Sequence, residues 1–316
     1  MGHLLPCTGE FVNDRFRDGK PVPYNGFRKE KIMGIYSDVL LTVDYDRTLT
    51  APDSTIPQRN LDAIRYFMDN GGVFTVNTGR SVPMSKSMWD KVPVNAPLLL
   101  YNGSAAFDPA TGELSAIVPI EMDMWQTVGE LLEMFPHLTV EIQSPEAHFN
   151  FIPNPKWDSF NAYNKCPYAT AKWGQDLGPF LKFTLYGEFH DDTVARLFEA
   201  TDEELAEIDA AQEALIRRYG DKIQVFRSAA RLLDIQAGGV SKDKAARALQ
   251  KKLGRKILVC VGDAHNDIPL LDGADYAFCP SDAILADQYE NVCPCAEGAV
   301  ADVIYEKIPE ILKNLK

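Results

Sequence analysis

The sequence lacks an apolar run long enough to cross a membrane, and it lacks the features of an export signal. No apolar stretch approaches the roughly 18 residues that span a bilayer. The first residues, MGHLLPCTGEF, show no basic region followed by a long apolar stretch. Cysteine is scarce, with 6 residues at irregular spacing and Cys260 inside an apolar run, which argues against a disulfide framework. We therefore expect a soluble cytoplasmic protein with reduced thiols.

Positively charged residues are fewer than negatively charged ones. Lysine and arginine together number 32 against 45 aspartates and glutamates, so the net charge is −13. A surface of this sign repels nucleic-acid backbones and anionic membranes, and we expect neither as a partner. Repeats and low-complexity segments are missing, and the 46% hydrophobic content is sufficient for a folded core. A length of 316 residues suggests about two domains.

Residues 36–102 alternate between short apolar runs and helical patterns. The run DVLLTVDYD begins at Asp38 and is typical of a strand buried on both faces. A helical pattern from Pro57 to Gly72 leads to a second strand, GVFTVNTG, and a helix over 81–92 leads to a third, PLLLYNG. This alternation predicts a doubly wound, mostly parallel α/β sheet.

The alternation stops after Gly103 and resumes at Ser241. Between them we expect strands at LTVEIQ, AHFNFI, LKFTLYGE, QVFR and LLDIQ, with helices around 123–135, 190–200 and 203–219. From Ser241 we expect a helix, the strand KILVCVGD, the helix DIPLLDG, the strand YAFCP and a helix near 302–315. The predicted fold is an α/β core with an inserted α+β unit. Its predicted parts are an irregular extension at 1–35, a core of 36–102 and 239–316, and an insertion at 103–238.

Two carboxylates follow the first predicted strand. Asp44 and Asp46 are two residues apart on an extended chain, so their side chains should point to the same side. Ligands bind at the carboxyl ends of strands in such sheets, and adjacent carboxylates repel each other unless a cation or a shared proton intervenes. Mg²⁺ is the natural cation here. An Asp-x-Asp also arises by chance at strand ends, so its position is the informative feature.

The second strand ends in Asn77-Thr78-Gly79-Arg80. The Thr78 hydroxyl and the free amides at the start of the next helix can hold a phosphate oxygen, although an ordinary turn and helix cap would have the same sequence. We interpret Arg80 as a surface or structural charge.

Lys242 falls in the first turn of a predicted helix, where its charge opposes the helix dipole. A nearby anionic nucleophile and phosphate would make this position favourable. Without that context, a solvated lysine beside Lys244 is the simpler interpretation.

The segment VGDAHNDIPLL is the strongest local signal. A buried strand and a glycine turn are followed by Asp263, Asn266 and Asp267 as a helix begins. Oxygen-bearing side chains suit a hard cation such as Mg²⁺, which takes one or two protein carboxylates and keeps several waters. Alternatively, Asn266 and Asp267 could merely cap the helix and complement its dipole.

Taken in order, DYDRT (44–48), NTGR (77–80), the lysine of GVSKDKA (239–245) and GDAHNDIPLL (262–271) resemble the four motifs of the haloacid dehalogenase superfamily of phosphatases. The YNG at 101–103 and the large insertion are similar to the Cof-type branch, whose members carry an α+β cap of the C2B kind. The resemblance covers residues 36–316 and leaves out the first 35.

The resemblance implies a role for each matching residue. Asp44 would attack phosphorus and form an aspartyl-phosphate, and Asp46 would protonate the leaving oxygen and then activate water. Phosphate would be held by Thr78, Gly79, Asn102 and Lys242. Mg²⁺ would be bound by the Asp44 side chain, the Asp46 backbone carbonyl and Asp263, with Asn266 and Asp267 positioning the metal and Lys242.

Two positions depart from the family pattern: Arg47 replaces the usual glycine, and Asn77 replaces a small residue. Arginine restricts the backbone and adds a charge near the phosphate, so Arg47 could alter substrate range or rate. We expect a Mg²⁺-dependent phosphatase of small phosphate esters such as sugar phosphates. A phosphomutase and a catalytically silent phosphometabolite-binding protein are the alternatives, and the sequence favours no particular oligomeric state.

Overall fold

The computed structural model describes residues 16–17, 20–21, 34–187 and 200–315. The expected helix around 190–200 and most of the expected extension at 1–35 lie outside this set. Within that extension, the short strands β1 (Phe16–Arg17) and β2 (Lys20–Pro21) pair antiparallel. In the described parts of the chain, no helix is both long and apolar enough to cross a bilayer.

A parallel sheet of five strands forms the core, as the sequence predicts. Its strand order is β16-β15-β14-β3-β4, and each pair of neighbours is parallel. The strands are β3 (Val39–Val43), β4 (Val73–Val76), β14 (Ile257–Val261), β15 (Tyr276–Pro280) and β16 (Glu290–Val292). Every residue of β3, β4 and β14 is buried, because helices cover both faces of the sheet.

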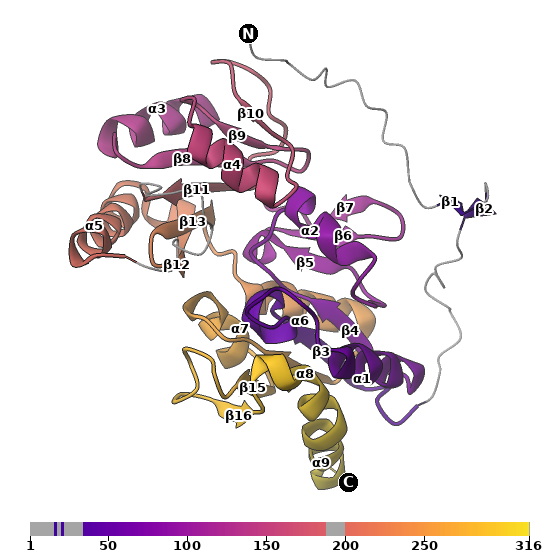
Figure 1. Ribbon diagram of the computed structural model, residues 1–316. Coiled ribbons are helices and arrows are strands. Elements are labelled where there is room, and N and C mark those ends of the chain that lie inside the picture. The colour runs from indigo at the N-terminus through magenta and orange to yellow at the C-terminus, as the bar shows by residue number, and fades with distance from the viewer. Residues whose placement is uncertain (1–15, 18–19, 22–33, 188–199, 316) are drawn as a thin grey trace. The chain divides into compact units, whose positions relative to one another are not determined.

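Helices lie on both faces of the parallel sheet (Figure 1). Each face has its own hydrophobic cluster, to which the helices on that face contribute. One face packs against α1 (Gln58–Asp69), α8 (Ala299–Asp302), the helical turn Val303–Lys307 and α9 (Ile308–Asn314). The other packs against α6 (Lys242–Leu253) and α7 (Ile268–Asp272). The expected helices at 57–72, 241–254, 267–273 and 302–315 are confirmed within a few residues.

The expected third strand forms as β5 (Leu98–Leu100) beside the end of β4. A parallel bridge between Asn77 and Leu99, and a hydrogen bond from the Thr78 amide to the Leu99 carbonyl at 2.9 Å, join the two segments. β5 does not continue the ladder of the parallel sheet beyond this bridge. It pairs instead with β6 (Ala105–Asp108), which pairs with β7 (Glu113–Ser115), in a three-stranded antiparallel sheet. Left-handed backbone at Tyr101 and Asn102, with φ of 53° and 52°, turns the chain back on itself. This small sheet spans the expected boundary at residue 103, and α2 (Val82–Trp89) precedes it.

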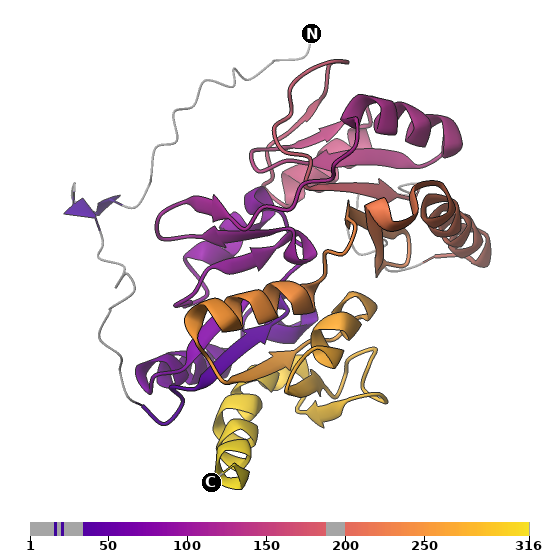
Figure 2. The same cartoon turned by 180° about the vertical axis from the view of Figure 1, so that it is seen from behind.

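The insertion contains a six-stranded, mostly antiparallel sheet of order β10-β9-β8-β11-β13-β12. Figure 2 shows this part of the chain, in magenta to brown, from behind. Its strands are β8 (Thr139–Gln143), β9 (His148–Asn150), β10 (Tyr168–Thr170), β11 (Lys182–Tyr186), β12 (Ile223–Ala229) and β13 (Leu232–Ala237). Helices α3 (Met124–Met134) and α5 (Asp202–Tyr219) cover its apolar face. The helix α4 (Pro155–Tyr163) has no counterpart in the sequence prediction, and its Trp157 and Phe160 pack with Tyr186.

The opposite face of this sheet is polar and buried. We call it the polar face, and it consists of Glu141, Gln143, His148, Asn150, Lys182, Thr184, Asp234 and Gln236. Contacts with α4 and with the core explain its burial. Trp157 of α4 donates from Nε1 to Glu141 Oε2. His148 Nε2 lies 2.8 Å from Ser81 Oγ, and Lys182 Nζ donates to the Gly79 carbonyl at 2.8 Å, so this part of the polar face lies against the loop that follows β4.

Candidate active site

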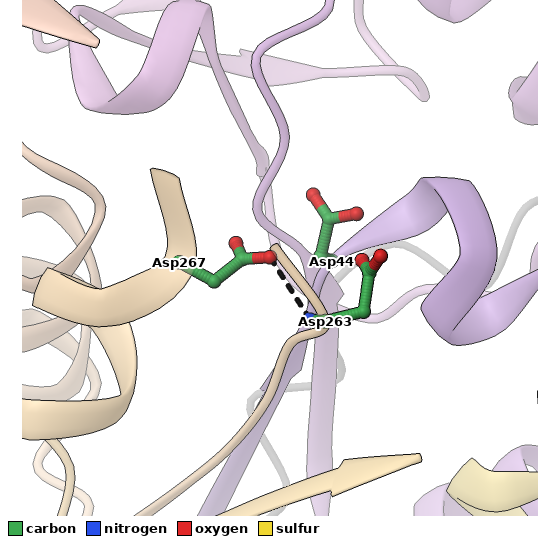
Figure 3. Close-up of side chains that lie close together, drawn as sticks. All are labelled: Asp44, Asp263 and Asp267. Atoms are coloured by element: carbon green, nitrogen blue, oxygen red, sulfur yellow. Dashed lines mark hydrogen bonds between the residues drawn. The ribbon is translucent and has the colours of Figure 1, made fainter. Parts of the chain in front are cut away.

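Three carboxylates meet at the carboxyl edge of the parallel sheet. Asp44 follows β3, Asp263 follows β14, and Asp267 ends the helical turn His265–Asp267 before α7. The parallel register places Val43 beside Val261, so the residues after both strands are neighbours. One oxygen from each carboxylate lies within 4.8 Å of the others, and Figure 3 shows the three side chains together. The structure thus brings residues of the first and fourth motifs together.

Lys242 lies within this acidic cluster. Its Nζ donates to Asp44 Oδ1 at 2.7 Å and to Asp267 Oδ1 at 2.6 Å, and its side chain is fully buried. The interpretation of Lys242 as a solvated lysine is therefore wrong. Asn77, one of the two departures from the family pattern, donates from Nδ2 to the Lys242 carbonyl at 2.9 Å. Asn77 thus fixes the start of α6, from which Lys242 reaches the cluster.

Asp267 and Asp263 are held in place by local hydrogen bonds. Asp267 Oδ2 accepts from the amides of Asp263 at 3.1 Å and Ala264 at 3.2 Å, which leaves its other oxygen for Lys242. A Cβ at Gly262 would lie 2.6 Å from Asp267 Cβ, so glycine is required for this close approach. Thr48 Oγ1 donates to Asp263 Oδ1 at 3.0 Å. These contacts fix the orientation of both carboxylates on the side of β14.

Burial raises the pKa of Asp44 and of Asp263. Burial, opposed by Lys242 and reinforced by Asp267, raises the pKa of Asp44 to about 7. Burial, Asp267 and Asp44 raise the pKa of Asp263 to about 8. The same carboxylates outweigh the effect of burial on Lys242 and raise its pKa. One lysine therefore does not offset three carboxylates, and a further cation would stabilise their charged forms.

The donor set fits Mg²⁺. All the side-chain atoms offered are carboxylate oxygens, the ligands that hard cations prefer, and the cluster carries more negative charge than Lys242 neutralises. Asn266 is half-buried on the same turn as Asp267. The carboxylate of Asp46 does not belong to this cluster.

Asp46 instead forms an ion pair with Arg80. Arg80 Nε donates to Asp46 Oδ2 at 2.8 Å and a terminal nitrogen donates to Oδ1 at 2.6 Å, which is a bidentate geometry. The guanidinium also lies 4.8 Å from the centre of the Tyr45 ring. Arg47 adopts a left-handed φ of 59°, the conformation in which glycine is favoured. Arginine in that position holds a left-handed conformation at a cost in strain.

The loop of residues 77–80, which we call the Thr78 loop, contacts Asn102. The Asn102 amide donates to the Thr78 carbonyl at 3.0 Å, and Asn102 itself is fully buried. A Cβ at Gly79 would lie 2.9 Å from Asn102 Oδ1, so glycine is needed where the two segments meet. The structure thus brings Thr78, Gly79 and Asn102 together.

Sequence reasoning missed several partners of these residues. Thr48 lies in the first motif, but nothing in the sequence indicates that it binds Asp263. Arg80 was interpreted as a surface or structural charge, and its bond to Asp46 depends on residues 34 positions apart in the chain. The approach of Lys182 to the Thr78 loop spans 103 positions. Contacts of this range follow from topology rather than from local pattern.

Comparison with known proteins gives one consistent family. A model described as haloacid dehalogenase-like hydrolase matches residues 41–286. A protein of Bacillus subtilis (strain 168), named 5-amino-6-(5-phospho-D-ribitylamino)uracil phosphatase, is 22% identical over 238 residues, which cover 74% of this chain and 80% of that protein.

Solved structures extend the likeness to the fold. A haloacid dehalogenase-like hydrolase from Bacteroides thetaiotaomicron aligns with a TM-score of 0.69 and 19% identity, covering 85% of this chain and 98% of its own. A structure described as a subclass IIB sugar phosphatase of this superfamily aligns with a TM-score of 0.66 and 17% identity, covering 86% of this chain and 99% of its own. Coverage of this extent includes the inserted α+β unit as well as the parallel sheet.

Proposed function

The chain belongs to the haloacid dehalogenase-like hydrolase family, and we propose that it is a Mg²⁺-dependent phosphatase that hydrolyses small phosphate monoesters through an aspartyl-phosphate. The observation that supports this most strongly is the buried cluster of Asp44, Asp263 and Asp267 around Lys242, beside the Thr78 loop. One similar protein is named as a phosphatase of a small phosphorylated compound.

In the first step, a carboxylate oxygen of Asp44 attacks phosphorus. The new bond joins that oxygen to phosphorus while the bond from phosphorus to the leaving oxygen breaks, and Asp46 gives its proton to that oxygen. Asp46 is paired with Arg80 in this structure, so this role requires the pair to separate. Thr78, Gly79 and Asn102 hold the phosphoryl oxygens meanwhile.

In the second step, water attacks the phosphorus of the aspartyl-phosphate. Asp46 takes a proton from the water, the bond from phosphorus to the Asp44 oxygen breaks, and inorganic phosphate leaves. Lys242 offsets the charge that gathers on Asp44 and the phosphoryl group throughout, which its fully buried Nζ is placed to do. Both carboxylates return to their starting states.

Asp44, Asp263 and the backbone carbonyl of Asp46 are the proposed ligands of Mg²⁺, with Asn266 and Asp267 as supporting residues. When bound, the ion supplies charge neutralisation and orients the phosphoryl group for in-line attack. The oxygen-only donor set and the excess negative charge of the cluster support this assignment.

We propose that residues 103–238 act as a cap over a core of 36–102 and 239–316, with 1–35 as a separate extension. The contacts of His148 with Ser81 and of Lys182 with Gly79 support this role, because they join the insertion to the Thr78 loop. A cytoplasmic location is part of the proposal. It is supported by the five described cysteines, all of which are free thiols.

The test is a turnover screen with p-nitrophenyl phosphate and a panel of phosphorylated metabolites, in EDTA and in Mg²⁺. We expect phosphate release that EDTA abolishes and Mg²⁺ restores, and that Ca²⁺ inhibits because its looser geometry misaligns the attack. Isomerised sugar phosphate without free phosphate would indicate a phosphomutase. Tight binding without turnover under any metal would indicate a sensor. Full activity in chelator would contradict the metal assignment.

A further inference from the structure

The strand β9 of the insertion carries a buried histidine that contacts the core. His148 Nε2 lies 2.8 Å from Ser81 Oγ, and both residues are fully buried. Ser81 is the N-cap of α2, and its Oγ also accepts from the Met84 amide at 3.3 Å. Because Ser81 directly follows the Thr78 loop, His148 contacts the core at the point where this loop ends.

Partners within the insertion orient the His148 ring. Asn161 Nδ2 donates to the Trp157 carbonyl at 3.1 Å, so Asn161 Oδ1 faces His148 Nδ1 as an acceptor at 2.9 Å. His148 Nδ1 therefore carries a proton. It also lies 3.4 Å from Glu141 Oε1, in an ion pair whose two side chains are fully buried. Cys166 Sγ is the remaining neighbour of the ring, at 3.4 Å from Nε2.

The ion pair determines which way the bond to Ser81 runs. Burial lowers the pKa of His148, but the adjacent Glu141 carboxylate raises it more strongly, to about 9. Burial acts to raise the pKa of Glu141, but His148 and hydrogen bonds from Gln143 and Trp157 lower it overall. Both ring nitrogens of a charged imidazole carry protons, so His148 Nε2 donates to Ser81 Oγ.

The position of Ser81 affects the hydroxyl that is proposed to bind phosphate. The amide of the preceding residue, Arg80, donates to Thr78 Oγ1 at 3.3 Å. This bond occupies a lone pair of the hydroxyl and leaves its proton to be donated to a phosphate oxygen. A shift of Ser81 would move the Arg80 amide and so change the orientation of Thr78.

The core holds the earlier part of the Thr78 loop and the insertion holds its end. The Thr78 amide donates to the Leu99 carbonyl at 2.9 Å, and the Arg80 carbonyl accepts from the Tyr101 amide at 3.1 Å. Within the described chain, the hydrogen-bonding partners of Ser81 are His148 and residues of α2 itself. The insertion thus supplies the restraint on Ser81 that comes from outside its own helix.

We propose that His148 is a positioning residue for phosphate binding: held by Glu141 and Asn161, it fixes the Ser81 hydroxyl and, through Ser81, the Thr78 loop. This inference rests on the proposed phosphatase function. The insertion then contributes to the binding of the phosphoryl group, which all substrates share. Such an effect is expected in KM and in inhibition by inorganic phosphate rather than in kcat.

The test compares two amide replacements of His148. Glutamine places its amide near the position of Nε2 and asparagine places its amide near that of Nδ1. His148→Gln therefore keeps a donor for Ser81, whereas His148→Asn keeps only the contacts on the side of Glu141. Both variants lose the buried charge, so their melting temperatures should fall by similar amounts. His137→Asn makes the same chemical change at an exposed position before β8 and is the control.

In Mg²⁺, KM for p-nitrophenyl phosphate and the inhibition constant of inorganic phosphate should rise about fivefold in His148→Asn, with kcat changed by less than about twofold. Both constants should stay within about twofold of the wild-type values in His148→Gln and in His137→Asn. The same rise is expected in Ser81→Ala, but not in Ser87→Ala, which changes an exposed serine of α2. The double variant His148→Asn with Ser81→Ala should be no weaker than either single one, because both remove the same bond.

Unchanged constants in a folded His148→Asn protein would overturn the inference. An equal rise in His148→Asn and His148→Gln would also overturn it, because the lost ion pair and not the bond to Ser81 would then be the cause. If neither His148 variant folds, Ser81→Ala decides against Ser87→Ala, and unchanged constants in Ser81→Ala would overturn the inference. Absence of phosphate release by the wild-type protein from p-nitrophenyl phosphate and from every metabolite of the panel would instead overturn the proposed phosphatase function.

Discussion

Replacing the proposed nucleophile should make the metal-free protein more stable while removing its activity. Asp44 has a pKa of about 7 in the folded protein against an ordinary value of 3.8. Asparagine has the shape of the protonated acid and carries no charge. The folded Asp44→Asn protein therefore lacks the unfavourable free energy of an ionised carboxylate in this cluster. Asparagine is also a poor nucleophile at phosphorus, so turnover should be nearly lost.

The magnitude follows from the two pKa values. They differ by about 3 pKa units, which corresponds to about 4 kcal/mol at about 1.36 kcal/mol per unit. A carboxyl whose pKa is raised by folding retains its full contribution to stability below pH 3.8 and loses it as the pH rises through about 7. The advantage of Asp44→Asn should therefore be about 1 kcal/mol at pH 4.5 and about 4 kcal/mol at pH 8.

The assay is urea unfolding of both proteins in EDTA at the two pH values. Asp62→Asn is the control, because Asp62 is an exposed residue of α1 and its replacement should change stability by less than about 0.5 kcal/mol at either pH. Excess Mg²⁺ should stabilise the wild type more than Asp44→Asn and so narrow the difference. An Asp44→Asn protein that is no more stable than wild type at pH 8 in EDTA would refute the reasoning.

Two further predictions concern the other buried charges. Lys242→Met leaves the three carboxylates without their buried cation, so the metal-free protein should lose about 3–5 kcal/mol of stability at pH 8, measured by urea unfolding. Lowering the pH should recover part of that loss, and an equal loss at pH 4.5 would contradict the ion-pair explanation. His148, whose pKa is lowered by burial but raised more strongly by Glu141, reaches about 9. Its contribution to stability is full below pH 6.5 and is lost as the pH rises through about 9. The melting temperature of His148→Gln, measured by thermal unfolding, should therefore fall less over this pH range than that of the wild type.

The local sequence pattern was sufficient to predict most of the parallel core. The buried run of β3 and the glycine after β14 specify strands and their turns, and the parallel register then brings Asp44 and Asp263 together. The resemblance to the haloacid dehalogenase superfamily rested on the order of four such turns, and the family match confirms it.

The features that the local sequence pattern failed to predict depend on contacts between residues far apart in the sequence. Three leucines in β5 have the composition of a central parallel strand, but the left-handed turn at Tyr101 and Asn102 directs the chain into a separate antiparallel sheet. Lys242 has an unfavourable position on its own helix, and its ion pairs with Asp44, 198 residues away, and with Asp267, 25 residues away, explain its burial. The pairing of Arg80 with Asp46 is of the same kind. Helix and strand patterns do not encode which side chains meet across such separations.

The most direct test of the account is to trap the covalent intermediate on Asp44. Asp46→Asn should be nearly inactive on a sugar phosphate, whose alkoxide needs a proton to leave, but should still transfer phosphate from p-nitrophenyl phosphate, whose leaving group is stable as the anion. Stopped flow should show a burst approaching one p-nitrophenolate per active site, and acid quench with peptide mass mapping should find the phosphate on Asp44. A burst with no phosphorylated peptide, or with phosphate on a residue other than Asp44, would contradict the central claim.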